Sequence, residues 1–290
     1  MTGLHQLLHP LETARAVRGR LRNRSERRAI LRKADLIVQD AYGVRFVLYA
    51  WNEPFLLRLV RRDYDRAQLL AVPRLVRRGA TIFDVGANIG SYSVFLSRLC
   101  GPGGVVFAFE PVPDTFGILK ETLALNRCDN VVPIEKALCE RLGTTQMHLF
   151  EPQYSGWNTM RAYTTTTPEG GRVAPNKSVE VPTDTLDNFC AEHEIERIDF
   201  LKVDVEGFEL SALVGARQLL GDKRIDYLCF EINQEALQGA GGVKSRDVFE
   251  ALESHGYACY QFDVPSEKFQ GPIHDTSEVW ANFYASWRGL

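Results

Sequence analysis

A short glycine-containing loop is the first candidate binding site in this chain. Residues 84–90, Asp-Val-Gly-Ala-Asn-Ile-Gly, end an apolar run that begins at Thr81, and a helical pattern follows them. Gly86 permits a tight turn, and Gly90 permits close packing or the close approach of a ligand. The start of the following helix would direct free backbone N–H groups and a positive dipole end toward that ligand. The expected binding residues of this loop are Asp84, Gly86, Asn88 and Gly90.

The end of the next predicted strand indicates which ligand the loop binds. Glu110 stands there, where a carboxylate accepts hydrogen bonds from both hydroxyls of a ribose. The dinucleotide fingerprint GxGxxG needs its second glycine to make room for a pyrophosphate, and Asn88 occupies that place here. The glycine-lysine pattern of P-loop ATPases is absent from the chain. These features favour S-adenosylmethionine, a nucleoside cofactor without phosphate.

Carboxylates follow two further strands, at the sheet edge where ligands bind. Residues 198–207 predict a buried strand that delivers Asp204 to its carboxyl end, with Glu206 in the turn beyond, and Glu231 closes the neighbouring strand. Methyl transfer from this cofactor needs an aligned nucleophile and, where the acceptor is an alcohol, a base. We expect Asp204, Glu206 and Glu231 to be catalytic, with Asp204 also contacting the cofactor. His274, in the loop Gly-Pro-Ile-His-Asp-Thr, is a further candidate base.

A metal ion is a less favoured alternative at the same edge. Asp204 and Glu231 could together bind Mg²⁺, because hard cations prefer carboxylate oxygens. The sequence shows no third ligand beside them, and no two cysteines lie at the spacing of a zinc site. We therefore expect no metal centre.

An insertion at 143–183 interrupts the regular pattern and is expected to bind the substrate. Its residues Tyr154, Trp157 and Asn158 combine aromatic rings with an amide. Such a set suits stacking on a sugar or a flat ring, with hydrogen bonds from the amide. A surface loop that packs on itself is the alternative.

Buried strands alternate with helices after residue 80, which predicts an α/β fold with a mostly parallel sheet and right-handed crossovers. The pattern predicts strands at 81–86, 104–111, 130–139, 198–207, 225–233, 257–263 and 278–286, strands in the insertion at 144–150 and 178–182, and helices at 93–99, 114–126, 209–220 and 245–255. Ligands of such sheets bind at the carboxyl ends of the strands.

Four segments in this order resemble the FkbM family of S-adenosylmethionine-dependent methyltransferases: DVGANIGSYSVFLSR, FAFEPVPDTF, VPTDTLDNF and IDFLKVDVEGFELSALVGA. The resemblance implies the class I methyltransferase fold, a Rossmann-like, seven-stranded, mostly parallel sheet with helices on both faces. It implies that the loop at 84–90 lines the methionine end of the cofactor, that Glu110 holds the ribose and that Ala137 lies near the adenine. The family mostly methylates hydroxyl oxygens of natural products, sugars or glycans, so a small molecule or a sugar is the expected substrate.

Composition and charge fit an ordinary globular enzyme. The 290 residues are 45% hydrophobic and 24% charged, with a net charge of −3. We expect an N-terminal helical, basic extension with a short strand at 1–75 and a methyltransferase domain at 76–290. Six scattered cysteines, with no apolar signal segment or membrane span, predict a cytoplasmic protein. The oligomeric state stays open, and a homodimer is compatible with the sequence.

Two other functions stay open at this point. Residues 1–35 carry nine basic and three acidic side chains. In a nucleic-acid methyltransferase, this basic segment could bind the phosphates of the nucleic acid. It could also contact an anionic membrane. Neither contact is favoured, because a solvated helix face explains the charges and the Asp/Asn-Pro-Pro-Tyr/Phe motif of amino-methylating enzymes is absent after the fourth strand. A non-catalytic cofactor-binding scaffold is the second alternative.

Overall fold

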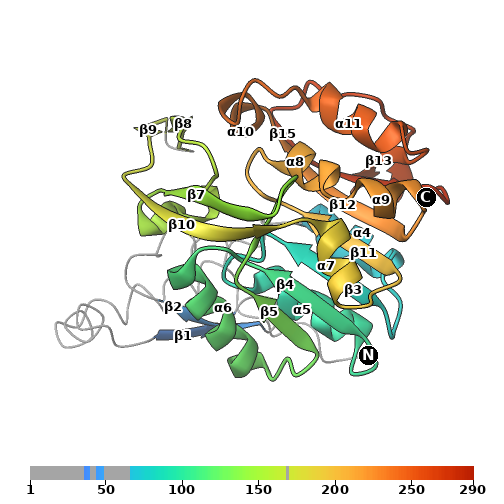
Figure 1. The fold of residues 1–290 in the computed structure, drawn as a ribbon. Coiled ribbons are helices and arrows are strands. Elements are labelled where there is room, and N and C mark those ends of the chain that lie inside the picture. The colour runs from blue at the N-terminus through green and yellow to red at the C-terminus, as the bar shows by residue number, and fades with distance from the viewer. Residues whose placement is uncertain (1–35, 40–43, 49–65, 168–169) are drawn as a thin grey trace.

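The structure is a computed structural model that describes residues 36–39, 44–48, 66–167 and 170–290. Its centre is an eight-stranded sheet with the strand order β14-β13-β15-β12-β11-β3-β4-β5 (Figure 1). The strands are β3 (Thr81–Val85), β4 (Val105–Phe109), β5 (Val131–Ile134), β11 (Ile198–Val203), β12 (Ile225–Asn233), β13 (Ala258–Asp263), β14 (Lys268–Gln270) and β15 (Trp280–Ser286). The pairs among β5, β4, β3, β11 and β12 are all parallel, and β15 runs antiparallel to both β12 and β13. The predicted mostly parallel α/β sheet is confirmed.

The seven predicted strands of this sheet are all present, and β14 adds an eighth at one edge. One predicted strand, 130–139, is shorter than expected. The chain leaves the central sheet after Ile134, and the next strand, β6 (Ala137–Leu138), pairs instead with β10 (Lys177–Asp184).

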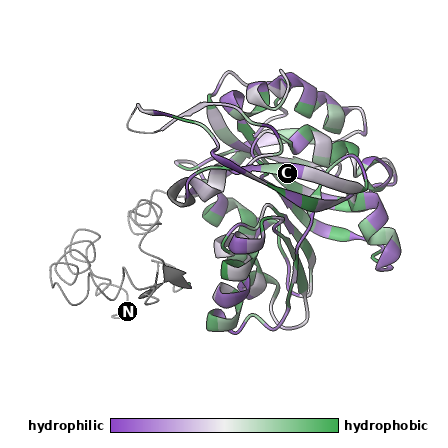
Figure 2. Ribbon diagram, turned by 60° about the vertical axis from the view of Figure 1, so that its left-hand side comes forward, coloured by the Kyte–Doolittle hydropathy of each residue, from purple (hydrophilic) through white to green (hydrophobic). Residues whose placement is uncertain are grey.

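Helices cover both faces of the sheet, because successive side chains of each strand point to opposite sides. One face packs on α4, α5 and α6, and the other on α7 to α11 (Figure 1). The helices are α4 (Arg66–Ala71), α5 (Ser91–Cys100), α6 (Pro113–Asn126), α7 (Leu186–Glu192), α8 (Glu209–Val214), α9 (Arg217–Gly221), α10 (Gln234–Gly239) and α11 (Ser245–Glu253). Hydrophilic and hydrophobic residues occur together in these helices, as expected when one side faces a sheet and the other faces water (Figure 2).

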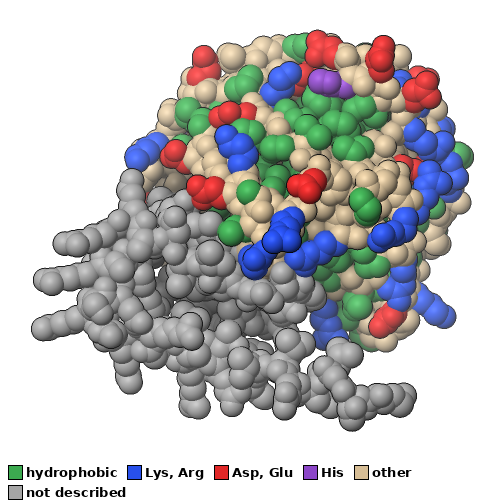
Figure 3. Space-filling model, turned by 90° about the horizontal axis from the view of Figure 1, so that it is seen from below, with side chains coloured by type: hydrophobic (Ala, Val, Ile, Leu, Met, Phe, Trp, Pro, Cys, Tyr) green, Lys and Arg blue, Asp and Glu red, His purple; other side chains and the backbone are tan. Residues whose placement is uncertain are grey.

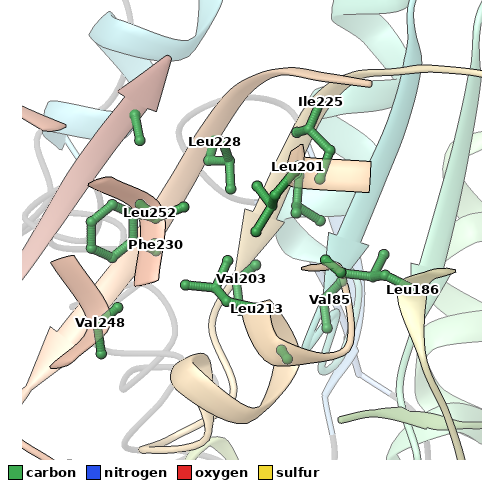
Figure 4. Close-up of a cluster of buried hydrophobic side chains, with 14 of the residues drawn as sticks. Val85, Leu186, Leu201, Val203, Leu213, Ile225, Leu228, Phe230, Val248 and Leu252 are labelled. Carbon is green, nitrogen blue, oxygen red and sulfur yellow. The ribbon is translucent and has the colours of Figure 1, made fainter. Parts of the chain in front are cut away.

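The core of the second face lies directly behind the carboxyl ends of β3, β11 and β12. Val85, Val203 and Phe230 pack there against Leu213 of α8 and Leu252 of α11 (Figure 4). Burying one such side chain stabilises the fold by about 1.5–3 kcal/mol relative to leaving it exposed. The strand ends are therefore firmly positioned by packing.

The helix predicted at 209–220 is divided into α8 and α9. The carbonyl of Gly215 accepts the backbone N–H of Asp187 at 2.9 Å instead of continuing the helix. The Asp187 carboxylate in turn accepts the backbone N–H groups of Gln218 and Leu219, at 2.9 and 3.0 Å, and so caps the start of α9. A contact with α7, distant in the sequence, interrupts the helical pattern.

The insertion forms a second, three-stranded sheet with the order β6-β10-β7, where β7 is Gly143–Leu149. Its two long strands confirm the predictions at 144–150 and 178–182. A small hairpin of β8 (Thr165–Thr166) and β9 (Arg172–Val173) lies at the outer end of this sheet (Figure 1).

Of the predicted N-terminal extension, the structure describes β1 (Leu36–Gln39), β2 (Arg45–Leu48), α4 and a 3-10 turn at Val72–Arg74. β1 and β2 pair antiparallel, and the backbone N–H of Arg45 donates to Asn126 of α6 at 3.0 Å. The basic segment at 1–35 lies outside the described residues. No helix in the described part of the chain is long and apolar enough to cross a membrane. Acidic and basic side chains are interspersed on the face seen in Figure 3.

Candidate active site

The glycine loop adopts backbone conformations that favour the residues found there. Gly86 and Gly90 have φ angles of 82° and 91°, and Asn88 has a φ of 48°. A Cβ atom on Gly86 would lie 1.8 Å from the carbonyl oxygen of Asp204, so only glycine fits at this position. The loop after β3 and the loop after β11 are therefore in direct contact. Gly90 directly precedes α5, whose first turn faces the loop.

Asp84, predicted to line the cofactor, is fully buried behind this loop. Its carboxylate accepts a 2.6 Å hydrogen bond from the Ser93 hydroxyl of α5 and lies 3.5 Å from Nζ of Lys202. Both groups belong to the protein interior. Asp84 thus supports the loop and the neighbouring strand from inside the fold.

Glu110 lies at the end of β4 and contacts the same loop. Its two carboxylate oxygens accept the backbone N–H groups of Asn88 and Val112, each at 3.0 Å. Burial raises the pKa of Glu110 to about 7, and these hydrogen bonds oppose the rise. The side-chain oxygen of Asn88 is buried and has no hydrogen-bond partner among the described residues. A loop with an unsatisfied acceptor beside a carboxylate fits a ligand that carries hydroxyl and amino donors.

Ala137, predicted near the adenine, is buried in β6. It packs in one hydrophobic cluster with Val112, which follows Glu110, and with Met147 and Val181 of the second sheet. The structure therefore brings Ala137 to the segment that continues from the Glu110 strand.

The three predicted catalytic carboxylates come together at the ends of β11 and β12. Asp204, Glu206 and Glu231 each offer a carboxylate oxygen, and these oxygens all lie within 4.8 Å of one another. Glu206 has a φ of 50°, and the following Gly207 has a φ of 94°. A Cβ atom on Gly207 would lie 2.4 Å from the carbonyl oxygen of Ala236, so close packing on α10 requires glycine in this turn. We refer to Asp204, Glu206 and Glu231 as the carboxylate cluster.

Like charges and burial change the acidity of the groups around the cluster. The pKa of Glu231 lies well above its ordinary value because of burial and because of the charges of Asp204 and Glu206, while a hydrogen bond from Trp280 opposes the rise. Burial also raises the pKa of Tyr163, and Glu206 contributes as a nearby negative charge. Sequence reasoning missed Tyr163 and Trp280 because no local motif marks them.

Glu206 supplies the third carboxylate that the sequence did not identify as a metal ligand. The oxygens have the type and spacing that a divalent cation could use. Acidic side chains also gather in this way without a metal, and the Lys202 ammonium lies 3.0 Å from Asp204. The geometry alone therefore assigns no ion to the cluster.

The insertion reaches both loops of the site. The rings of Tyr154 and Trp157 stack with centroids 4.8 Å apart and planes at 5°. Gly156, between them, has its Cβ position 3.4 Å from the Asn88 amide nitrogen, and the Thr159 hydroxyl donates to the backbone oxygen of Glu206 at 3.1 Å. The insertion, far from both loops in the sequence, therefore borders the site.

Two predicted site residues are engaged elsewhere within the protein. The Asn158 side-chain oxygen accepts the backbone N–H of Phe150 at 3.0 Å. His274 is 65% exposed and its ring nitrogen lies 2.6 Å from the Glu253 carboxylate of α11. Within the described contacts, nothing joins His274 to the carboxylate cluster.

A buried carboxyl beside the cluster leads to a prediction for stability. One oxygen of Glu209 accepts the backbone N–H groups of Val205 and Gly207, at 3.1 and 3.3 Å. Burial raises the pKa of Glu209 from 4.5 to about 7. The folded protein then keeps this proton in a pH range where the unfolded chain has lost it, so the free energy of unfolding falls as pH rises from about 4.5 to about 7. The glutamine of Glu209→Gln carries no charge at any of these pH values. As pH rises from about 5 to about 8, the free energy of unfolding of this variant should fall by roughly 2 kcal/mol less than that of the wild type.

Urea unfolding at the two pH values measures this difference. Glu192→Gln, a change at an exposed position of α7, should keep the wild-type pH dependence. Equal pH dependence in the wild type and Glu209→Gln would show that Glu209 ionises normally in the folded protein.

The chain is similar to known methyltransferases. The Methyltransferase FkbM domain matches residues 84–259. The hexuronic acid methyltransferase AglP of Haloferax volcanii is 29% identical over 213 residues, which cover 73% of this chain and 77% of the relative. The 31-O-demethyl-FK506 methyltransferase FkbM of Streptomyces tacrolimicus is 30% identical over 223 residues, which cover 70% and 80%. A solved structure, the methyltransferase FkbM from Methylobacillus flagellatus, aligns at 15% identity with a TM-score of 0.43, over 82% of this chain and 61% of that chain.

The matched segment holds both the glycine loop and the carboxylate cluster, and it spans more than half of the chain. The protein therefore belongs to the FkbM family of S-adenosylmethionine-dependent methyltransferases.

Proposed function

We propose that the protein transfers a methyl group from S-adenosylmethionine to a hydroxyl oxygen of a sugar or a small-molecule natural product. The observation that carries this proposal is the carboxylate cluster, which stands beside the glycine loop at the carboxyl ends of the central strands. The names of two relatives, a hexuronic acid methyltransferase and a 31-O-demethyl-FK506 methyltransferase, support the substrate class.

Gly86, Asn88 and Gly90 of the glycine loop would hold the cofactor, which supplies a methyl group on a positively charged sulfur when bound, while Asp84 would support the loop from behind. Glu110 would accept the ribose hydroxyls with the lone pairs that its two backbone contacts leave free. The Asn88 side-chain oxygen, which has no partner in the described structure, would accept a donor of the same ligand. Ala137 would line the adenine side.

The carboxylate cluster would orient the acceptor hydroxyl and take its proton as the oxygen is methylated. Proton transfer by a positioned side chain typically contributes 10²–10⁴-fold to a rate. Glu231 is well suited to hold the proton, because its pKa lies well above the ordinary value of a glutamate. Asp204 projects from the strand that contacts the glycine loop and would orient the hydroxyl beside the methyl group.

The stacked rings of Tyr154 and Trp157 would form one wall for the acceptor. The side-chain oxygen of Asn158 already accepts the backbone N–H of Phe150. Asn158 would therefore contribute to this wall by holding the insertion in place. None of the six buried cysteines forms a disulfide, which supports the proposal of a reducing, cytoplasmic setting.

Cofactor selectivity gives a direct prediction. S-adenosylmethionine and S-adenosylhomocysteine should each stabilise the protein by about 2.7 kcal/mol when present at 100 times the dissociation constant, whereas NAD and ATP should not. Asn88 in the place of the middle glycine, together with Glu110, is the physical reason. Thermal shift measurements test it, and stabilisation by NAD alone would contradict the cofactor assignment.

Mass spectrometry of the reaction products identifies the methyl acceptor. Incubating the protein and S-adenosylmethionine with a metabolite and glycan extract should add one methylene unit to the mass of a hydroxyl-bearing compound. Heat-denatured protein serves as the control. A product methylated on nitrogen, or methylation of nucleic acid only, would overturn the proposed substrate class.

A further inference from the structure

Lys202 is a charged residue in the interior of the central sheet. It lies in β11, in register with Asp84 of β3 on one side and with Cys229 of β12 on the other. Its side chain is 5% exposed, and no other lysine or arginine is buried in the part of the chain that the structure describes. A buried ammonium is strongly unfavourable unless it is paired. The groups around Lys202 therefore indicate its role.

Two carboxylates and a ring surround the ammonium. Nζ of Lys202 lies 3.0 Å from Oδ2 of Asp204 and 3.5 Å from Oδ1 of Asp84. The ring centroid of Tyr92, from α5, is 5.2 Å from Nζ. Burial alone lowers the pKa of Lys202, but the two carboxylates raise it above its ordinary value, so the lysine stays charged.

The two carboxylates differ in what else they contact. Asp84 is completely buried and is held by the hydroxyl of Ser93 at 2.6 Å. Asp204 is 28% exposed and belongs to the carboxylate cluster. Lys202 thus connects a carboxylate fixed inside the fold to one that stands at the site.

We propose that Lys202 is a positioning residue, which holds the Asp204 carboxylate in one orientation within the active site and balances the charge of Asp84. Without the ammonium, the Asp204 carboxylate would lie beside the acidic Glu206 with no cation at 3.0 Å, and repulsion would turn it toward solvent. The consequence for turnover rests on the proposed function. The fixed position of Asp204 is a property of the protein alone.

Crystal structures of the S-adenosylhomocysteine complexes of the wild type and Lys202→Met provide the test. Methionine has nearly the length of the lysine stem and no charge. In the variant, the Asp204 carboxylate should leave its place beside position 202, while the affinity for S-adenosylhomocysteine stays within a few-fold of wild type. The double variant Asp84→Asn/Lys202→Met removes both buried charges and keeps an acceptor for Ser93, so it tests the same displacement if the single variant does not fold.

Arg77→Met is the matched control. Arg77 pairs at 2.7 Å with Asp199, which lies in β11 like Lys202. Asp199 also accepts the backbone N–H of Thr81 at the start of β3. Loss of this ion pair should leave Asp204 in place. An unmoved Asp204 carboxylate in both Lys202 variants would overturn the inference.

Turnover gives a second measurement, made with the acceptor found by mass gain. Lys202→Met should lower kcat at least tenfold, and its effect should not add to that of Asp204→Asn, because the lysine acts through the aspartate. Additive effects would mean that Lys202 acts independently of Asp204 and would overturn the inference. If Asp204 is displaced in Lys202→Met but the wild-type protein methylates no hydroxyl, the proposed function is contradicted and the positioning role is still supported.

Discussion

Asp204→Asn is expected to lower the rate of methyl transfer about 10²–10⁴-fold while leaving cofactor affinity within a few-fold of wild type. The side chain of Asp204 lies within the carboxylate cluster, and the backbone oxygen of Asp204 lies against Gly86 of the glycine loop. Asparagine keeps the size of the side chain but removes the charge that orients an acceptor hydroxyl and helps to take its proton. Single-turnover kinetics with the acceptor, together with calorimetric titration of S-adenosylhomocysteine, separates the chemical step from cofactor binding.

A control substitution makes this result specific to the site. Asp222→Asn changes an exposed aspartate after α9 and should leave both rate and affinity unchanged. If Asp204→Asn retains the wild-type rate, another carboxylate of the cluster accepts the proton. The same kinetics and titration on Glu231→Gln would then test whether that carboxylate is Glu231. Chelation by EDTA belongs to the same series, since loss of activity that Mg²⁺ restores would show that the cluster holds an ion.

Glu110→Ala is expected to weaken cofactor binding by about 2–4 kcal/mol, roughly 30-fold to several hundred-fold in dissociation constant. The carboxylate that would hold the ribose also accepts the backbone N–H of Asn88 and so shapes the glycine loop. Its removal takes away both the direct contact and part of the order of the loop. Titration calorimetry with S-adenosylhomocysteine measures the change.

Glu110→Gln distinguishes the two contributions. Glutamine can accept a hydrogen bond from the loop but carries no charge, so its loss of affinity should be smaller than that of alanine. Because burial raises the pKa of Glu110 to about 7, wild-type affinity should increase as pH rises through that value and the Gln variant should show no such increase. Glu192→Ala, an exposed change in α7, is the control for stability. Wild-type affinity in Glu110→Ala would leave this residue with a purely structural role in the loop.

Much of the fold follows from local pattern. Alternating strands and helices predict the parallel sheet because burial on both faces demands continuous apolar runs such as residues 105–109. The prediction of one helix at 209–220 was wrong. The carbonyl of Gly215 accepts the backbone N–H of Asp187, a residue of another helix, and two shorter helices form instead. Local pattern contains no information about such a partner.

The amino-acid sequence alone predicts the sheet edge at which the candidate site residues gather. Gly86, Glu110 and Asp204 follow three of the strands and Glu231 lies near the end of a fourth, so parallel strands must bring them to one edge. This inference needs only strand order and direction, which the spacing of apolar runs encodes.

The three-dimensional packing sets which predicted site residues lie together and which are engaged elsewhere in the protein. It buries Asp84 behind Lys202, turns His274 toward Glu253 and brings the insertion to Asn88. Each of these outcomes depends on segments far apart in the sequence that approach within a few ångströms. Burial and charge then act over those distances, because the free energy of a carboxylate or an ammonium inside a protein is set by its neighbours in space rather than in the chain.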